Sequence, residues 1–315
     1  MAKRLPRRRV TRRVSSDQFG SIGPFLAARL DERWRNFTVQ VERTKRRSSE
    51  ASIHDLRVSV RRLMATVDIV LAIMPDVRLL KARRTLKKHL RAFGELRDVH
   101  IQIIQLQELV RQFPVLKPFL QELKKREQVL VRGGRKHILR MRLQSLEQMM
   151  IRTRNGLLGL FTQHAMDSIG AAAALGAMGS AFARAIDLRQ RVQPGNSKTI
   201  HMLRVAFKRC RYSVEVLQPL LSGVDAGLLK AMNAYQTRMG IIQDNEVLTA
   251  TLSGYAVRKR RLSVQSLVAA QQHLAQRRAV LVREFLARID ELESFWRPPR
   301  AQLTHRRESG RRIKG

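Results

Sequence analysis

The sequence predicts an all-α protein whose two halves arise from an internal duplication. Apolar residues recur at intervals of three and four along most of the chain, as in amphipathic helices. One helical pattern, Ile53–Leu71, occurs again without a gap as Ile200–Gln218, with Ile, His, Leu, Arg and Val at matching positions. No run of alternating β-branched residues indicates a strand. With 315 residues, 44% of them hydrophobic, the chain can bury a sizeable core.

The first half, residues 17–154, follows a basic tail that we expect to be disordered, residues 1–16. Its expected helices end at proline or glycine, which interrupt helical patterns. They span 17–47 with a perturbation at 20–24, about Ser52–Met74 ended by Pro75 and Asp76, Val77–Phe93, Val99–Phe113, and Lys117–Arg132 and Lys136–Arg154 on either side of a break at Gly133–Gly134.

The second half, residues 155–297, is expected to begin with a helix that runs through an Ala-rich stretch to Gln193. The turn Pro194–Ser197 follows, with Ser197 as the candidate cap of the next helix. That helix is expected to end near Pro219–Gly223. Further helices are expected over Leu228–Met239 and Asp244–Arg261, and a long helix over Ser263–Trp296 is expected to close the fold. A second basic tail that we expect to be disordered, residues 298–315, follows.

Both copies of the repeated pattern carry a stripe of cations. At about 100° per residue, His54, Arg57 and Arg61 share one face of their helix, opposite an apolar face. His201, Arg204, Lys208 and Arg211 form the same stripe in the second copy. A solvated polar face is the alternative interpretation, but cations at matching positions in both copies favour a binding surface. Asp68 and Glu215 lie on the stripes, and we interpret them as carboxylates that hold an arginine in place.

Each copy is followed by a second shared motif, Phe93–Asp98 (FGELRD) and Met239–Asp244 (MGIIQD). Glycine between helical patterns indicates a helix end, so Asp98 and Asp244 are expected to cap the helices that follow. A pair of catalytic carboxylates is the alternative, which the expected capping role makes unnecessary.

The paired motifs resemble those of the CHAD domain, the conserved histidine α-helical domain, over roughly residues 18–297. The match is carried by His54, Arg57, Arg61, Arg62, Gly94, Arg97 and Asp98, and again by His201, Arg204, Lys208, Arg209, Arg211, Tyr212, Gly240, Gln243 and Asp244. The resemblance implies two pseudo-symmetric helical bundles around a central basic cavity that binds inorganic polyphosphate without catalysis. The first copy departs from the second at Met64 and Ala65, where the second has Arg211 and Tyr212, so the first half is expected to offer fewer contacts.

The candidate polyphosphate-binding residues combine this resemblance with a further row of cations on the third expected helix, which could form a second wall of a basic groove. They are His54, Arg57, Arg61, Arg62, Lys81, Lys88, Arg91, Arg97, His201, Arg204, Lys208, Arg209, Arg211 and Tyr212. Arginine binds phosphate oxygens in bidentate fashion and lysine adds point charges.

The charge of the chain points to an anionic partner. Lys and Arg number 62 against 25 Asp and Glu, a formal net charge of +37, so polyphosphate, nucleic acid or an anionic surface would relieve self-repulsion. Aromatic residues make up only 5%, which argues against a base-stacking platform. Two alternatives to polyphosphate binding stay open: a non-specific nucleic-acid-binding protein that uses the basic tails, and an accessory subunit of a polyphosphate- or triphosphate-metabolising enzyme.

Other chemistry finds little support in the sequence. No HExxH or CxxC motif suggests a metal site, no glycine-rich phosphate loop suggests a nucleotide site, and we expect neither a cofactor nor enzymatic activity. The single cysteine, Cys210, is expected to be buried and suits a reducing compartment, so we expect a cytoplasmic protein, associated with polyphosphate granules. The apolar stretch Ile169–Ala183 is short and rich in Ala and Gly, so we expect no membrane span.

Overall fold

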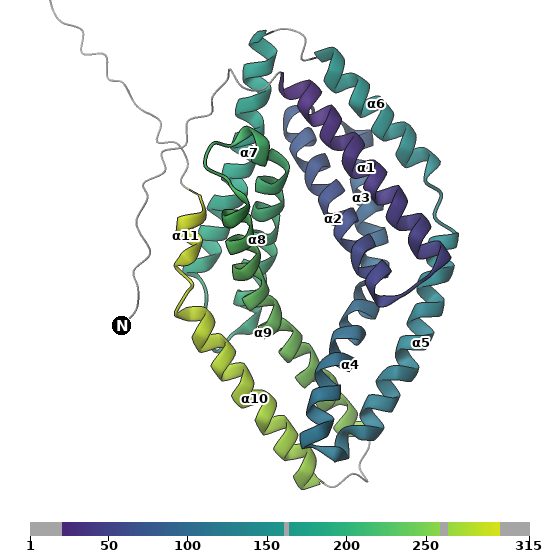
Figure 1. Cartoon of the computed structure of the whole chain (residues 1–315). Helices are drawn as coiled ribbons and strands as arrows, with labels where there is room; N and C mark the ends of the chain where they lie inside the picture. Colours follow the sequence, from purple (N-terminus) through teal and green to yellow (C-terminus); the bar gives the residue numbers. More distant parts are fainter. Residues whose placement is uncertain (1–20, 161–163, 259–263, 297–315) are drawn as a thin grey trace, which may run out of the picture.

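The secondary-structure elements of the described residues are all helices (Figure 1). The computed structural model describes residues 21–160, 164–258 and 264–296, and within these ranges it contains α-helices, two short 3-10 segments and no β-strand. This confirms the predicted all-α class. The tails expected at 1–16 and 298–315 lie outside the described residues.

The helices follow one another with short connections. Those of the first part are α1 (Ile22–Arg46), α2 (Glu50–Ile73), α3 (Val77–Ala92), α4 (Gly94–Gln112), η1 (Pro114–Leu116), α5 (Lys117–Leu139) and α6 (Gln144–Leu160). Those of the second part are α7 (His164–Gln190), α8 (Ser197–Leu217), η2 (Gln218–Leu220), α9 (Ala226–Arg258), α10 (Val264–Leu286) and α11 (Glu291–Phe295).

Short polar residues cap the starts of α2 and α8, which carry the cationic stripes, and of α3. Ser49 forms a capping box with Ser52 at the start of α2. Asp76, which was expected to end α2, instead accepts hydrogen bonds from the first backbone N–H groups of α3. Asn196, rather than the predicted Ser197, caps α8.

The predicted breaks at glycine are wrong in three places. Helix α5 runs through Gly133 and Gly134, α9 runs through Gly240, and Gly94 is the first residue of α4 rather than the end of α3. Glycine in a helix interior costs only about 1 kcal/mol relative to alanine, and burial of the apolar face of a long helix outweighs this cost. Asp98 and Asp244 therefore lie inside α4 and α9 and are not N-caps.

Two other expected elements differ in length. The closing helix predicted over Ser263–Trp296 is divided into α10 and α11 by a turn at residues 287–290. The helix predicted to open the second half at residue 155 and to run to Gln193 is shorter, because residues 155–160 belong to α6 and α7 spans His164–Gln190. Within α7, Met166–Gln190 is the single helical segment among the described residues that is long and apolar enough to cross a membrane, with a mean hydropathy of 1.4. Within the apolar part of this segment, 28% of the residues are buried.

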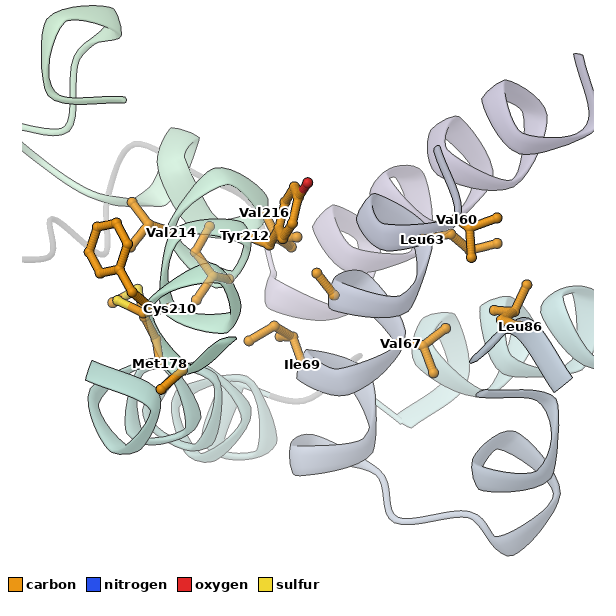
Figure 2. Close-up of a cluster of buried hydrophobic side chains, with 14 of the residues drawn as sticks. Val60, Leu63, Val67, Ile69, Leu86, Met178, Cys210, Tyr212, Val214 and Val216 are labelled. Carbon is orange, nitrogen blue, oxygen red and sulfur yellow. The ribbon is translucent and has the colours of Figure 1, made fainter. Parts of the chain in front are cut away.

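The larger hydrophobic cluster joins residues from both parts of the chain. Figure 2 shows Val60, Leu63 and Val67 of α2 on the side of Leu86 from α3, while Ile69 lies on the opposite side, toward α8. All of them are nearly inaccessible to solvent. A second cluster fills the space between α4, α5, α9 and α10 at the other end of the molecule (Figure 1).

The two parts of the chain meet along α2 and α4 on one side and α7, α8 and α9 on the other. Helix α2 packs against α7 and α8, and α4 packs against α9. Because the cationic stripes lie on α2 and α8, this packing determines how close the stripes come to one another.

Candidate anion-binding site

Cations from three helices converge where the two parts of the chain meet. Lys208 of α8 interacts electrostatically with two arginines of α2, Arg57 and Arg61, and with Arg204 and Arg211 of its own helix. Arg97 of α4 interacts with Arg57, Arg61 and Arg204. We call this set the basic cluster: Arg57, Arg61, Arg97, Arg204, Lys208 and Arg211.

The period of the helix explains why these side chains reach one place. Positions 57 and 61, and positions 204, 208 and 211, lie one turn apart on their helices. The opposite faces are buried in the core through Leu56 and Leu63 on α2 and through Leu203, Phe207 and Cys210 on α8. Anchoring of the apolar faces therefore turns both stripes toward the same region, as the sequence predicts for the cations of α2 and α8.

Arg57 is the most deeply buried member of the basic cluster. The residue is 8% exposed, and Nη1 donates a hydrogen bond of 2.9 Å to the carbonyl oxygen of Leu90 near the C-terminal end of α3. Burial and the charge of Arg61 lower the pKa of Arg57 to about 10. A carbonyl partner fixes the guanidinium without neutralising it, so the site keeps this positive charge.

Tyr212 supports two arginines of the cluster. Its ring is buried, and the guanidinium of Arg211 lies over it with Cζ 4.3 Å from the ring centroid. Arg61 lies against the Tyr212 hydroxyl, and Nε of Arg211 also donates to Oε1 of Gln236 at 3.0 Å. Tyr212 thus belongs to the site as a support for the cations.

Gly240 lets α9 approach the guanidinium of Arg204 closely. A Cβ atom at this position would lie 3.4 Å from Nη2 and 3.5 Å from Nε of Arg204, in ordinary van der Waals contact with the guanidinium. The sequence motif around Gly240 was interpreted as a helix end, and its role beside Arg204 could not be found without the packing of α8 on α9.

Carboxylates balance only part of this charge. Asp98 and Asp244 interact with Arg204, and Asp98 also interacts with Arg57. Partial burial raises the pKa of both carboxyls, while Arg57 acts against this at Asp98 and Arg204 at Asp244. Their position inside helices makes them partners of the cluster, whereas the predicted N-capping role is wrong.

Two donors of the cluster have no protein acceptor among the described residues. Nη1 of Arg97 and Nε of Arg204 are buried and have no hydrogen-bond acceptor within the parts of the chain that the structure describes. A buried guanidinium N–H without an acceptor is costly, and an anion that reaches the cluster would supply oxygen atoms for it.

The remaining predicted residues lie around the cluster or apart from it. His54 is exposed beside Arg97, and partial burial and this charge lower the pKa of His54. His201 is also exposed, and its Nδ1 lies 2.8 Å from Oε1 of Gln243. Exposed cations that do not join the basic cluster are Arg209, Lys81, Lys88 and Arg91.

Arg62 takes part in a different network. Its Nε lies 2.6 Å from Oε1 of Glu215, and this carboxylate also pairs with Arg33 at 3.7 Å and Arg211 at 3.6 Å. Glu215 thereby connects α1, α2 and α8, as expected of a carboxylate that holds arginines in place. Asp68 has the same role with Arg83, whose Nη2 donates to it at 2.9 Å.

A separate hollow of about 560 Å³ lies between α7 and α8. Its floor is apolar, with Ala177 and Ala181 from α7 and Val205 from α8, and His201 and Arg209 stand among its lining residues. These two predicted residues therefore face a largely apolar surface, unlike the members of the basic cluster.

Comparison with known proteins assigns the fold and the sequence pattern to one family. The family model described as the CHAD domain matches residues 14–253. No curated protein matches the chain.

Two solved structures share the arrangement of helices. The crystal structure of the CHAD domain from the plant Ricinus communis superimposes with a TM-score of 0.67 at 17% identity, over 93% of this chain and 98% of that chain. PptA from Streptomyces chartreusis superimposes with a TM-score of 0.54 at 14% identity, over 87% of this chain and 100% of that chain. At these identities the similarity concerns the fold.

Proposed function

Because the chain belongs to the CHAD domain family, we propose that it binds inorganic polyphosphate at the basic cluster, without cleaving or extending it. The observation that carries this proposal is the convergence of five arginines and Lys208 from α2, α4 and α8, whose charge Asp98, Asp244 and Glu215 only partly balance. A polyanion with closely spaced oxygens would restore the balance and accept the free guanidinium N–H groups.

Polyphosphate suits the site better than duplex nucleic acid does. It is a flexible chain with about one negative charge per phosphate and no bases, so it can bring several phosphates to cations that are half-buried between helices. The phosphates of a duplex are held on a rigid outer surface, where exposed cations such as Lys81 and Lys88 would reach them more easily than Arg57.

A competition titration of polyphosphate of defined length against duplex DNA and RNA at about 150 mM salt tests the proposal, because charges farther apart than about 8 Å are then largely screened. The central variant, R61Q/R204Q/K208Q, should lose polyphosphate affinity by roughly a hundredfold or more, since each charged hydrogen bond contributes roughly 1.5–3 kcal/mol before desolvation. Circular dichroism verifies that the variant is folded.

Two variants that replace the same number of basic residues serve as controls. The exposed α5 cations are replaced in K125Q/R132Q/R135Q, and those of the predicted second wall in K81Q/K88Q/R91Q. The proposal fails if the α5 control loses as much affinity as the central variant, or if DNA and polyphosphate bind equally per phosphate. Release of orthophosphate by the wild type above the central variant would contradict the absence of catalysis.

A further inference from the structure

The hollow between α7 and α8 has the size and position of a small-molecule site. The two helices pack against each other (Figure 1), and the space between them has a volume of about 560 Å³. Its lining residues His201, Val205 and Arg209 follow one another on α8 at intervals of four residues, so the hollow extends over roughly 12 Å. Sites for small molecules commonly have volumes of about 300–1,000 Å³ and lie between the helices of bundles.

The floor of the hollow exposes apolar surface that the fold leaves uncovered. Met202 and Val205 of α8 are each 47% exposed, although both lie beside α7. The facing positions of α7 include Ala177 and Ala181, whose small side chains leave the space open. Single exposed apolar residues are ordinary, but here two of them border one concave space, where an apolar ligand would remove their surface from water.

The charge around this apolar floor is positive. None of the described residues that line the hollow is a carboxylate. Arg209 approaches Asp68 only to 4.0 Å, and 68% of its side chain is exposed. Asp68 is also bound by Arg83, whose Nη2 donates to it at 2.9 Å. The guanidinium of Arg209 therefore keeps most of its capacity for an anionic ligand.

The other two basic side chains of the lining are engaged by the protein. Nη1 of Arg184 donates to Oδ2 of Asp187 at 2.7 Å, and Nδ1 of His201 lies 2.8 Å from Oε1 of Gln243. Arg209 is thus the basic group of the hollow that is best placed to hold an anion, and it lies at the end of the apolar floor.

We propose that this hollow binds a small anionic amphiphile, a molecule with an aliphatic body and one carboxylate or phosphate group. Its body lies on Met202 and Val205, and its anionic group binds Arg209. A free molecule suits a concave space between two helices better than a bilayer does, because a bilayer is entered by side chains that project from a surface. This inference is independent of polyphosphate binding, since polyphosphate has no apolar body and Arg209 lies outside the basic cluster.

Isothermal titration of the full chain with decanoate, at about 150 mM salt, tests the site. Decanoate should bind saturably with one molecule per chain. Acetate has the same anionic group without the aliphatic body, and decyltrimethylammonium has the same body with the opposite charge. Neither should displace decanoate, because the hollow selects for the combination of an apolar body and an anion.

Two variants locate the bound molecule, and each has a matched control on α5. V205W fills the hollow and should weaken decanoate binding at least tenfold, whereas V129W, at a valine that is 58% exposed, should not change it. R209Q should weaken binding about tenfold through the loss of a charged hydrogen bond, whereas R132Q, at another exposed arginine, should not. Circular dichroism verifies folding, and R209Q decides the matter if V205W does not fold.

Vesicles of phosphatidylglycerol separate a free ligand from a membrane surface. Tryptophan favours the membrane interface, so V205W should strengthen vesicle binding if this face docks on a bilayer, although it blocks the hollow. Stronger vesicle binding by V205W together with no saturable decanoate binding by the wild type would overturn the inference. Equal losses of decanoate affinity in R209Q and R132Q would do the same.

Discussion

At the scale of single residues, Lys208 differs from the arginines of the site because neighbouring charges can make it lose its proton, whereas the arginines stay protonated. The amine of Lys208 is positioned by α8 against Arg57 and Arg61 of the facing helix, so protonation in the folded state is opposed by charges that cannot leave. The unfolded chain lacks this opposition. Protonation of Lys208 therefore destabilises the folded state, and this destabilisation can be measured through the pH dependence of the free energy of unfolding.

The free energy of unfolding of the ligand-free protein should rise between pH 7 and 8. The pKa of Lys208 is about 6 in the folded state and about 10.4 in an unfolded chain, so the unfolded state binds more protons across this interval and stability increases with pH. The slope from this group is at most about 1.4 kcal/mol per pH unit. Cys210 stays protonated in the folded state across this window, because burial raises the pKa of its thiol to about 12.

Denaturant melts at the two pH values measure this slope. K208M should flatten it, because methionine keeps the stem of the side chain and has no titrating group. K125M, at an exposed position of α5, is the matched control and should keep the wild-type slope. Equal slopes for K208M and the wild type would show that Lys208 keeps its proton within the cluster.

The sequence could predict which residues carry the site only where helical spacing determines their direction. Arg57 and Arg61 lie on one face of α2, Arg204 and Lys208 lie on one face of α8, and the opposite, apolar faces of both helices are buried in the core. Their convergence therefore follows from the helical spacing once α2 and α8 pack against each other. Arg62 also matches the family motif, yet it pairs with Glu215 because of how α2 meets α8. That pairing depends on the rotation and register of two packed helices, which one sequence does not encode locally.

At the scale of elements, the predicted capping residues marked helix starts no better than glycine marked helix ends. Ser197, Asp98 and Asp244 were predicted as caps, whereas the residues that cap α2, α3 and α8 are Ser49, Asp76 and Asn196. Glycine has a low helix propensity that tertiary packing overrides, as α5 and α9 demonstrate. Glycine still destabilises a helix relative to alanine, however, so replacing a helical glycine by alanine can stabilise the protein.

Two neighbouring glycines of α5 should respond differently to alanine. A Cβ atom at Gly133 meets nothing within 4 Å, whereas at Gly134 it would lie 3.1 Å from Cε1 of Phe93, a buried ring. G133A should therefore stabilise the protein by about 0.5–1 kcal/mol through the lower entropy of the unfolded chain. In G134A the ring of Phe93 must shift, so the gain should be lost or reversed.

Thermal or denaturant unfolding of the two variants measures the difference, and each serves as the control for the other because the change in composition is the same. A helix that ended at Gly133–Gly134, as the sequence pattern suggested, would make both substitutions destabilising. A gain in G133A thus also checks that α5 continues through this pair.

At the scale of the whole molecule, a formal net charge of +37 must be reconciled with a fold whose larger core joins both parts of the chain. The apolar surface buried along α2 and α8 favours association of the two stripes, and their cations oppose it. The fold buries the apolar faces of both helices and leaves the basic cluster partly exposed to solvent. An anionic ligand would remove the opposing term, which links overall stability to binding.

The basic tails and the basic cluster should contribute to polyphosphate binding in different ways. Long-range attraction by many exposed cations accelerates encounter and depends steeply on salt, whereas cations held by a folded core are already ordered. Each contact made by a tail that the sequence predicts to be disordered would cost ordering entropy, so tails should add little affinity at about 150 mM salt.

Deleting residues 1–16 and 300–315 should therefore slow association and reduce the salt dependence of the affinity, because fewer counterions are released, while most of the affinity at about 150 mM salt remains. R61Q/R204Q/K208Q in the full chain should do the reverse: association stays fast, dissociation accelerates and affinity is lost, since the tails are intact and the ordered contacts are gone. Stopped-flow and equilibrium titrations of both proteins, with polyphosphate of one length and at several salt concentrations, separate these effects. If the tail deletion loses most of the affinity and the folded triple variant keeps it, polyphosphate is held outside the basic cluster, and the convergence of α2, α4 and α8 serves another purpose.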